Sequence, residues 1–301
     1  MSKYLTIDIG GTNIKYAVMT DSLEFLEKGE IPTPRESLEE FEDTLVTIYE
    51  KFKDQDVKAL CMSAPGRIDS SIGYFFTSGA LGYISGHNLA DELKERIPVP
   101  ICVENDAKAA ALAELWKGSM KGYSSGSVIT LGTGIGGSVI LGGRLVRGET
   151  FAAGEFSGIS SVWHKRYNRD DTWAGCASTT SLVGMYAEKK GLDFSEVNGR
   201  IFFEAANSGE EDALEVLSDF CDNVVCGIMS LQLILDVQRY AIGGGISLQP
   251  ILIETLQRKL DELYEEYAGK MASSKPEIVA CTFGNDANMI GALYHYLYEM
   301  K

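Results

Sequence analysis

The feature that most constrains the fold is the start of the chain, where two apolar, β-prone runs flank a glycine turn. The first run covers residues 4–9, the second covers residues 13–19, and Gly10 and Gly11 lie between them. This pattern predicts a β-hairpin. Because glycines let backbone N–H groups approach a ligand closely, such a turn can form a concave anion-binding site. An ordinary tight hairpin is the alternative interpretation of the same residues.

Polar side chains around this turn point to a nucleotide. A hydroxyl at Thr12, an amide at Asn13 and an ammonium at Lys15 follow the glycines, and Asp8 ends the first strand. An acidic residue beside a phosphate site makes chemical sense when Mg²⁺ lies between them. The motif is not a P-loop, because the pattern Gly-x-x-x-x-Gly-Lys-Ser/Thr is absent. The hairpin therefore predicts binding of a nucleotide–Mg²⁺ complex.

The order strand, Gly/Thr turn, strand recurs more than one hundred residues later, between the runs 128–131 and 137–141. Two such hairpins predict two similar halves that face one another across a cleft. A third glycine cluster follows the strand-like run 240–242, where a simple strand-to-helix turn is the alternative. The residues of these two later clusters are Gly132, Thr133, Gly134, Gly243, Gly244 and Gly245.

Composition limits the class of protein. The chain has 301 residues, 45% of them hydrophobic, which is enough for two globular domains. Its formal net charge of −16 would repel nucleic acid and anionic membranes, so neither is an expected partner. No apolar run approaches the length of a membrane span, and the N-terminus has the pattern of a core strand rather than a signal peptide. We therefore expect a cytoplasmic protein.

The cysteines are scattered, and no two of them form a Cys-x-x-Cys pair. Several lie in apolar runs, where a reduced cysteine behaves as a small hydrophobic residue. We expect structural thiols in a reducing compartment. The six positions are Cys61, Cys102, Cys176, Cys221, Cys226 and Cys281.

Strand-like and helix-like segments alternate along the chain, which predicts an α/β architecture with mixed sheets. The segment 148–180 is irregular and rich in Gly, Ser, Trp and Asp. Strands are expected over 4–9, 13–19, 57–63, 100–103, 126–131, 137–141, 238–242 and 277–281. Helices are expected over 36–53, 88–96, 106–117, 248–267 and 285–299, with a mostly helical part over 180–235.

Six motifs, in order, resemble the ROK family of sugar kinases and repressors, within the actin-like ATPase superfamily. They are residues 8–15, 63–69, 103–110, 131–137, the pair Gly154-Glu155, and residues 243–247. The resemblance implies two RNase-H-like α/β domains with an active-site cleft between them. It divides the chain into a smaller domain of residues 1–110 plus 285–301, to which the C-terminal helix returns, and a larger domain of residues 111–284. Many members of the family are dimers, so a homodimer is left open.

The resemblance also gives a role to the carboxylate that follows the strand 101–103. Alone, Asp106 could simply cap the helix that begins there. The matching aspartate is the family's catalytic base, which accepts the proton of a sugar hydroxyl as its oxygen attacks the γ-phosphorus. By the same resemblance, Asn105, Glu155 and Gly82 would contact the sugar.

The cofactors implied are ATP and Mg²⁺. Asp8 resembles the metal-side aspartate, which acts on Mg²⁺ through water. The cofactor-binding residues fall into three groups: a first phosphate loop, a second phosphate loop and a border to the adenosine. They are Gly10, Gly11, Thr12, Asn13 and Lys15 in the first, Gly132, Thr133 and Gly134 in the second, and Gly243, Gly244 and Gly245 in the third.

This chain departs from the family pattern after Glu155. Many relatives have a sugar-site histidine where this chain has Gly158, and then a zinc module of one His and three Cys. Between residues 155 and 181 the chain offers only His164 and Cys176. Because a structural zinc site normally needs four N or S ligands, no zinc site is predicted.

Two consequences of this departure are hypotheses. Trp163 and Trp173 would supply the packing that the metal supplies elsewhere. A second sugar-binding glutamate of the family falls near Ala174, so the pocket would admit a substituent at the anomeric carbon, as in a β-glucoside, or an N-acetyl group at C2. Arg147, Trp163 and His164 are candidates to replace the missing contacts.

The predicted function is an ATP-dependent sugar kinase that transfers the γ-phosphate to a hydroxyl, O6, of a hexose, an N-acetylhexosamine or a β-glucoside. The alternatives are a ROK-type sugar-responsive regulator and a non-catalytic sugar sensor. A regulator would need a DNA-binding segment before the hairpin, and a sensor would lack the groups of the reaction. Asp8, Thr12, Asp106 and Thr133 are all present.

Overall fold

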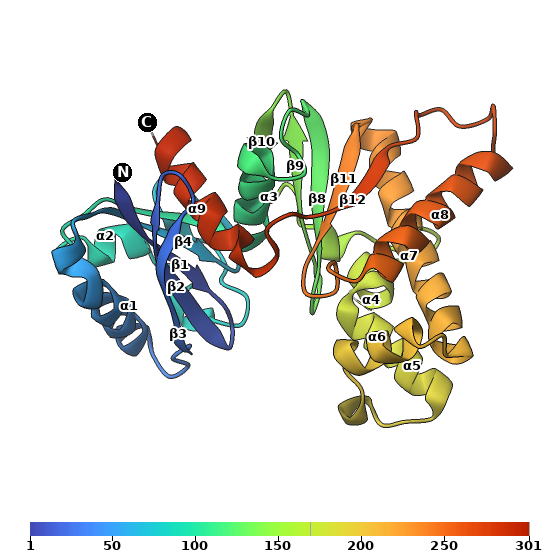
Figure 1. Ribbon diagram of the computed structural model, residues 1–301, viewed down its shortest axis with the longest axis horizontal. Helices are drawn as coiled ribbons and strands as arrows, with labels where there is room; N and C mark the ends of the chain where they lie inside the picture. The colour runs from blue at the N-terminus through green and yellow to red at the C-terminus, as the bar shows by residue number, and fades with distance from the viewer. Residues whose placement is uncertain (169, 301) are drawn as a thin grey trace. The chain divides into compact units, whose positions relative to one another are not determined.

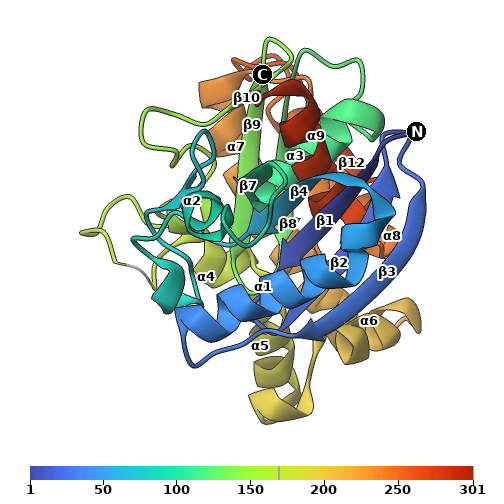
Figure 2. The same ribbon diagram turned by 90° about the vertical axis from the view of Figure 1, so that its left-hand side faces the viewer.

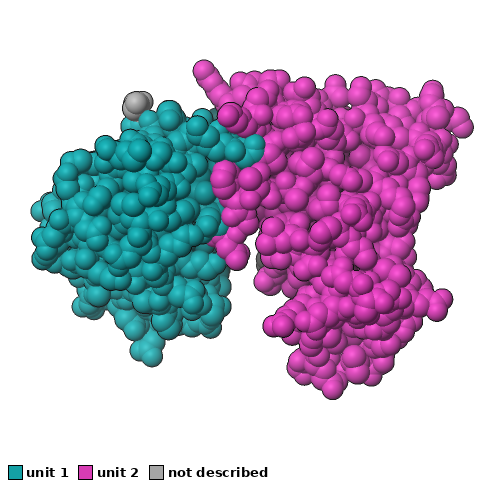
Figure 3. Space-filling model, in the orientation of Figure 1, with its two compact units in different colours: residues 1–118, 147–152, 286–301 teal, residues 119–146, 153–285 magenta. Residues whose placement is uncertain are grey.

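The computed structural model describes residues 1–168 and 170–300, which form two compact units (Figure 3). The chain passes between the units four times. Unit 1 contains Met1–Gly118, Arg147–Ala152 and Asp286–Lys301. Unit 2 contains Ser119–Val146 and Ala153–Asn285.

Each unit is built on a five-stranded sheet, and the two sheets have the same strand order. In each sheet, three strands that are consecutive in the chain pair in antiparallel fashion. The earliest of the three lies in the middle of the sheet, and two further strands parallel to it complete the other half. In unit 1 the order is β3(Phe25–Pro32), β2(Asn13–Thr20), β1(Lys3–Ile9), β4(Val57–Ala64), β7(Ile101–Asn105). In unit 2 it is β10(Arg144–Val146), β9(Ile135–Leu141), β8(Ser125–Leu131), β11(Arg239–Gly243), β12(Glu277–Ala280). The predicted fold class, α/β with two RNase-H-like domains, is confirmed.

Helices cover both faces of the sheet of unit 1 (Figures 1 and 2). On one face, α1(Leu38–Phe52) buries an apolar side that includes Phe41 and Leu45, next to Leu5 of β1. The helix begins where the side chain of Ser37 accepts a hydrogen bond from the backbone N–H of Glu40. On the other face lie α9(Ala287–Tyr298) and, packed against it, α3(Asp106–Lys117).

The contact between α3 and α9 depends on small residues. A Cβ added at Gly291 of α9 would lie 1.7 Å from the backbone oxygen of Ala109 in α3. Several neighbours on α3 are also alanines, so the two helix backbones approach closely. Beyond this contact, Trp116 of α3 packs against Tyr294 and Tyr298 of α9. The last helix of the chain is therefore an integral part of unit 1.

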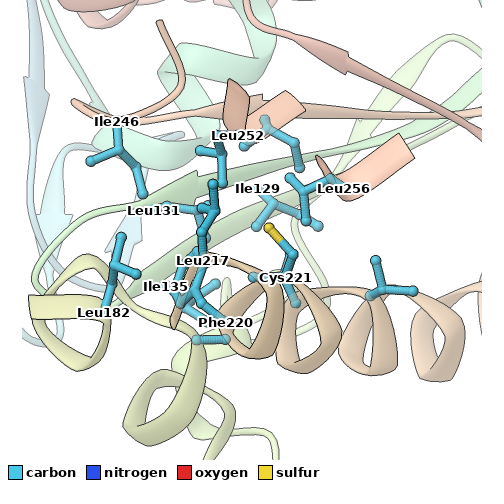
Figure 4. Packing of buried hydrophobic residues seen from close by; sticks show 14 of the residues in the cluster. Ile129, Leu131, Ile135, Leu182, Leu217, Phe220, Cys221, Ile246, Leu252 and Leu256 are labelled. Carbon is cyan, nitrogen blue, oxygen red and sulfur yellow. The ribbon is translucent and has the colours of Figure 1, made fainter. Parts of the chain in front are cut away.

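Unit 2 has five α-helices in its described part. They are α4(Trp173–Ala177), α5(Thr179–Lys190), α6(Gly199–Asn207), α7(Glu211–Leu235) and α8(Pro250–Glu266). Figure 4 shows how α7 and α8 bury the sheet: Leu217 and Phe220 of α7 lie among Ile129 of β8, Ile135 of β9 and Leu256 of α8.

Among the residues that the structure describes, α7 is the one helix that length and composition alone would allow to cross a membrane. Half of its most apolar window is buried inside the protein. The sequence showed no membrane-length apolar run because Glu215, Asp219 and Asp222 interrupt it. A core helix of a globular unit can have the same length, hydropathy and burial as α7.

Most predicted elements are confirmed to within a few residues, and the helix Asp106–Lys117 has the predicted bounds. The predicted helix over 88–96 is shorter, as α2(Leu89–Leu93). The predicted domain boundary at residue 110 falls inside α3, whose whole length lies in unit 1. Elements without a predicted counterpart are β3, β10, the helix α4 within the segment predicted to be irregular, and the small hairpin of β5(Ile68–Asp69) and β6(Tyr74–Phe75). Short 3₁₀ helices occur at Lys53–Gln55, Gly82–Ile84, Phe156–Gly158, Phe194–Glu196 and Gly284–Asp286.

The packing hypothesis for the two tryptophans is half wrong. Trp173 is buried, its ring packs on Phe156, and its indole N–H donates to the backbone oxygen of Asn223 at 3.1 Å. Trp163 is 79% exposed, so it contributes no core packing. The physical reason is that Trp173 begins a helix that lies against α7, whereas Trp163 lies in the irregular segment before it.

The thiols agree with a structural role. All six cysteines are free, and four of them are buried. Burial raises the pKa of the Cys61 thiol well above its usual range. Burial, with the nearby charge of Asp222, raises the pKa of Cys221 to about 12. Such thiols stay protonated and unreactive at neutral pH.

Candidate functional site

The N-terminal hairpin places an acidic and a basic side chain opposite one another. In the register of β1 and β2, Asp8 pairs with Lys15, so their side chains lie on the same side of the hairpin. The turn between them is closed by a hydrogen bond from the N–H of Gly10 to the oxygen of Asn13, at 3.0 Å. The predicted first phosphate loop is thus a short, closed turn at the end of β1.

Two residues that sequence reasoning missed hold this turn in place. Thr33 donates its hydroxyl to the oxygen of Gly10 at 2.7 Å and its backbone N–H to the oxygen of Thr12 at 2.9 Å. The guanidinium of Arg35 donates to the oxygen of Gly11 at 2.9 Å. Both follow β3, a strand that the sequence did not reveal, which explains the omission.

The carboxylate of Asp8 is oriented by residues from two distant segments. Ser63, at the end of β4, donates its hydroxyl to Oδ1 at 2.6 Å. Asn288, in the first turn of α9, donates its amide to the same oxygen at 2.9 Å. A carboxylate held in this way, with the hydroxyl of Thr12 nearby in the chain, is the hard-oxygen donor set that Mg²⁺ prefers. The residues present therefore fit the metal that the sequence predicted.

Register also brings Asp106 to the edge of the sheet where Asp8 lies. Asp8 pairs with Ser63 in β4, and Ser63 pairs with Glu104 in β7. These strands are parallel, so all three residues lie at the carboxyl end of the sheet, where α/β proteins bind ligands. Asp106 follows Glu104 by two residues.

The helix cap at this position is Asn105 rather than Asp106. The side-chain oxygen of Asn105 accepts the backbone N–H of Lys108 at 3.1 Å. Its amide nitrogen donates to the oxygen of Gly66 at 2.9 Å and to Oδ1 of Asp106 at 2.9 Å. The same Oδ1 accepts the N–H of Ala107 at 2.8 Å. Asp106 is thus the first residue of α3, where the helix dipole stabilises an ionised carboxylate.

In unit 2 the second hairpin is closed and anchored in a similar way. The N–H of Gly132 donates to the oxygen of Gly134 at 3.0 Å. The hydroxyl of Ser157 accepts the N–H of Ile135 at 2.8 Å and donates to its oxygen at 3.0 Å. These two hydrogen bonds attach the 3₁₀ turn that follows Glu155 to the predicted second phosphate loop. The side chain of Glu155 is exposed.

The third glycine cluster lies beside the second phosphate loop because β8 and β11 are adjacent and parallel. Gly243 pairs with Thr130. Gly244 has φ +92°, and a Cβ there would lie 2.2 Å from the oxygen of Leu131, so only glycine fits. The cluster is therefore the strand-to-helix turn considered from sequence, between β11 and α8, and its predicted border to the adenosine stays a prediction.

A cavity of about 350 Å³ opens at this edge of unit 2. It is lined by Gly132 and Thr133 of the second loop, by Gly245 of the third cluster, and by the beginnings of α5 and α6. Sequence reasoning missed the helix residues here, among them Thr179 and Asn198, because nothing local indicates that these helices begin beside the glycines. Thr179 is tied to the loop, since its N–H donates to the oxygen of Gly132 at 2.9 Å.

The remaining predicted sugar contacts are more dispersed. Gly82 begins a 3₁₀ helix in unit 1 and is exposed, with open space where a Cβ would lie. The preceding Ala80 is close to the first loop, 3.6 Å from a Cβ added at Gly11. His164 is exposed. In the part of the chain with described coordinates, no group of three metal-ligand residues includes His164 or Cys176, and the absence of zinc stays a prediction.

Arg147, a candidate sugar contact, is engaged elsewhere. It forms ion pairs with Glu104 and Glu299, and His295 lies against the same carboxylates. Burial lowers the pKa of Arg147, but the charge of Glu104 and the hydrogen bond to Glu299 outweigh burial and raise it. Burial raises the pKa of Glu299, but hydrogen bonds from His295 and Arg147 outweigh burial and lower it. Sequence reasoning did not find this cluster, because its members come from three segments.

The comparisons with known proteins agree with this geometry. The ROK family model matches residues 4–298. A glucokinase of Halalkalibacterium halodurans is 29% identical, over 96% of this chain and 93% of that protein. A beta-glucoside kinase of Listeria monocytogenes is 31% identical, over 99% of this chain and 98% of that protein. A ROK family protein of Streptococcus pneumoniae, solved in complex with sucrose, has a TM-score of 0.88 and 31% identity, and covers 99% of this chain and 98% of its own.

The matched segment contains both glycine hairpins, the strand end with Asp106 and the C-terminal helix that orients Asp8. The named relatives are sugar kinases, and they are similar to this chain along nearly its whole length. The chain belongs to the ROK family and is a carbohydrate kinase.

Proposed function

We propose that this kinase transfers the γ-phosphate of ATP to the 6-hydroxyl of a hexose that carries a substituent, with Asp106 as the base. The observation that carries the proposal is the register Asp8–Ser63–Glu104. It aligns the metal-side carboxylate and the strand that leads to Asp106 at one edge of unit 1.

The residues of unit 1 have distinct roles in the proposed reaction. Lys15 and the N–H groups of the first loop would attract the phosphates, and Asp8 would hold Mg²⁺. The metal would neutralise charge on the phosphates. Asp106 accepts the proton of the sugar hydroxyl. Two N–H donors on its Oδ1 fix the rotation of its side chain, so the carboxylate is preorganised rather than mobile.

The residues of unit 2 are proposed to hold the nucleotide. The cavity beside Gly132, Thr133 and Gly245 combines backbone N–H groups of a glycine turn with the apolar side chains of Val183 and Ile246. That combination suits a nucleoside, whose base needs apolar contact and whose phosphates need N–H donors. The proposed compartment is the cytoplasm, where ATP is available and thiols remain reduced.

The substituent is proposed to lie on the anomeric carbon, as in a β-glucoside. Gly158 has no side chain to close the pocket at the position of the family's histidine. A Cβ there would lie 3.5 Å from the hydroxyl of Tyr167, which offers a hydrogen-bonding group in its place. The similarity to a beta-glucoside kinase and to a protein solved with sucrose supports a substrate larger than one hexose ring. An N-acetylhexosamine is the second candidate.

The test is a coupled ADP-release assay with ATP and Mg²⁺ across a sugar panel. The panel holds glucose, mannose, N-acetylglucosamine, N-acetylmannosamine, cellobiose and a methyl β-glucoside, with Asp106→Asn as the control. Highest kcat/KM on the β-glucosides, lost in the control, supports the proposal. Higher kcat/KM on plain glucose would contradict the substituent. ATP binding without ADP release from any sugar would favour the sensor.

A further inference from the structure

The strand that leads to Asp106 contains a fully buried carboxylate, Glu104. One of its oxygens, Oε1, accepts the backbone N–H of Asn105 at 2.8 Å. The other, Oε2, accepts Nε and Nη2 of Arg147 at 3.0 and 2.6 Å. A buried charge requires a partner of opposite charge with good hydrogen-bond geometry. Glu104 therefore joins the guanidinium of Arg147 to the backbone that immediately precedes Asp106.

The guanidinium also reaches the C-terminal helix. Arg147 donates to Glu299, and Glu299 accepts Nδ1 of His295 at 2.9 Å. Nε2 of His295 faces the backbone oxygen of Ser70 at 3.2 Å. An ionised carboxylate and a carbonyl are both acceptors, which favours a proton on each ring nitrogen, the imidazolium form. The four side chains, here called the buried ion network, then carry two positive and two negative charges.

These groups could also suggest a metal site, since ligand atoms of Glu104, His295 and Glu299 lie within 4.8 Å of one another. The guanidinium of Arg147 donates to both carboxylates. The positive charge that the carboxylates require is therefore supplied by a side chain of the protein, and the network is an ion-pair cluster.

Arg147 begins the crossover segment, residues 147–152, which belongs to unit 1 although the chain on both sides of it belongs to unit 2. Buried Lys108 of α3 donates to the oxygen of Phe151 at 3.2 Å. Arg67 donates to the oxygen of Thr150 at 3.5 Å, and the ring of Phe151 stacks on Phe76. Phe151 has φ +60°, which a bulky residue adopts only where its surroundings impose it. The crossover segment is thus held in one conformation by unit 1.

We propose that Arg147 is a positioning residue for the phosphoryl transfer: by closing the buried ion network it fixes the crossover segment to the end of β7 and so sets the position of Asn105 and Asp106. This inference rests on the proposed function. Arg147 acts through Glu104 and does not itself touch the reacting atoms. Its partners in the network are Glu104, His295 and Glu299, so the nucleotide site should be unaffected by its loss.

The structure offers a way to separate positioning from folding. A cavity of about 320 Å³ is lined by Arg147, His295 and Glu299. If Arg147 is shortened to alanine, guanidinium ion from solution can enter this space and restore the lost charge. The conservative variant Arg147→Lys keeps the positive charge. A single ammonium, however, cannot reproduce the hydrogen bonds that the planar guanidinium donates to Glu104 and Glu299. The matched control is Arg144→Ala, an exposed arginine three residues earlier.

The experiment measures kcat and KM at a temperature where thermal unfolding shows each full-length variant to be folded. We expect kcat of Arg147→Lys and Arg147→Ala to fall on the order of tenfold to a hundredfold, as for small misplacements of reacting groups. KM for ATP should stay constant, and millimolar guanidinium should restore kcat of Arg147→Ala only. Arg144→Ala should match the wild type. Unchanged kcat in folded Arg147→Lys, or a loss in folded Arg147→Ala that guanidinium does not reverse, would overturn the inference.

Two further results keep the inference separable from the proposed function. If Arg147→Ala does not fold, Arg147→Lys decides the outcome. If the wild type releases no ADP with any sugar, the proposed function fails. The role of the buried ion network is then tested by amide hydrogen exchange without any measurement of activity. Faster exchange at Asn105 and in the crossover segment of Arg147→Lys, but not of Arg144→Ala, supports the network. Equal exchange in all three proteins refutes it.

Discussion

At the scale of single residues, the site is defined by which groups hold each functional side chain. Asp8 looked from the sequence like a strand-end carboxylate, and Asp106, taken without the family resemblance, looked like a helix cap. The structure gives the capping role to Asn105, which also donates to Asp106. It gives Asp8 two donors, one of them from a residue 280 positions away, Asn288. The identity of a residue indicated the chemistry, but its partners decide its orientation.

His295 illustrates a residue whose surroundings create a pH dependence. Burial lowers its pKa, but the hydrogen bond to Glu299 and the charge of Glu104 outweigh burial and the repulsion of Arg147, so the pKa is raised. A raised pKa in the folded protein means that the charged imidazole stabilises the fold. This contribution is complete below the unfolded-state value of about 6.5 and is lost as the pH rises through the higher, folded-state pKa.

We therefore expect the free energy of unfolding of the wild type to decline as the pH rises above about 6.5, and this decline to be absent in His295→Gln. Urea titrations across that range measure it. His164→Gln is the matched control, because His164 is exposed. The same slope in the wild type and in His295→Gln would show that His295 does not titrate as inferred.

At the scale of elements, the structure predicts opposite effects of a glycine-to-alanine substitution at two helix positions, one in the close contact of α3 and α9 and one in open space on α5. Gly291→Ala places a Cβ against a backbone oxygen at 1.7 Å, so the helices must separate. We expect a loss of roughly 1–3 kcal/mol, the usual cost of overpacking. Gly184→Ala in α5 meets no atom within 4 Å and should gain about 0.5–1 kcal/mol through helix propensity. Urea unfolding of both variants tests this, and equal effects would contradict the packing.

Another element shows why a strand escaped the sequence analysis. β3 alternates between half-buried and exposed residues and lies at the edge of its sheet, with Glu27, Lys28 and Glu30 along it. Charged edge strands resist aggregation but lack the apolar run by which strands are recognised. Gly29 is needed there because the ring of Tyr16 occupies the space of its side chain. Only pairing with β2 makes the segment a strand.

At the scale of the whole molecule, unit 1 is completed by residues far apart in the chain. Removing residues 286–301 would delete the donor to Asp8, the partner of α3 and two members of the buried ion network. We expect this truncation to unfold unit 1 and to leave the apolar core of unit 2, whose members all precede residue 286. Limited proteolysis followed by peptide mapping should cut unit 1 first. Cleavage spread evenly over both units would contradict this organisation.

The sequence by itself determined the two glycine hairpins, the alternation of strands and helices, and the motifs of the family. These depend on local rules: side chains alternate along a strand, repeat along a helix, and glycine permits turns that other residues avoid. Tertiary structure alone decided that Asn288 orients Asp8 and that Arg147 joins Glu104 to Glu299. The physical reason is that these contacts follow from strand order and helix packing, which bring together segments that no local pattern connects.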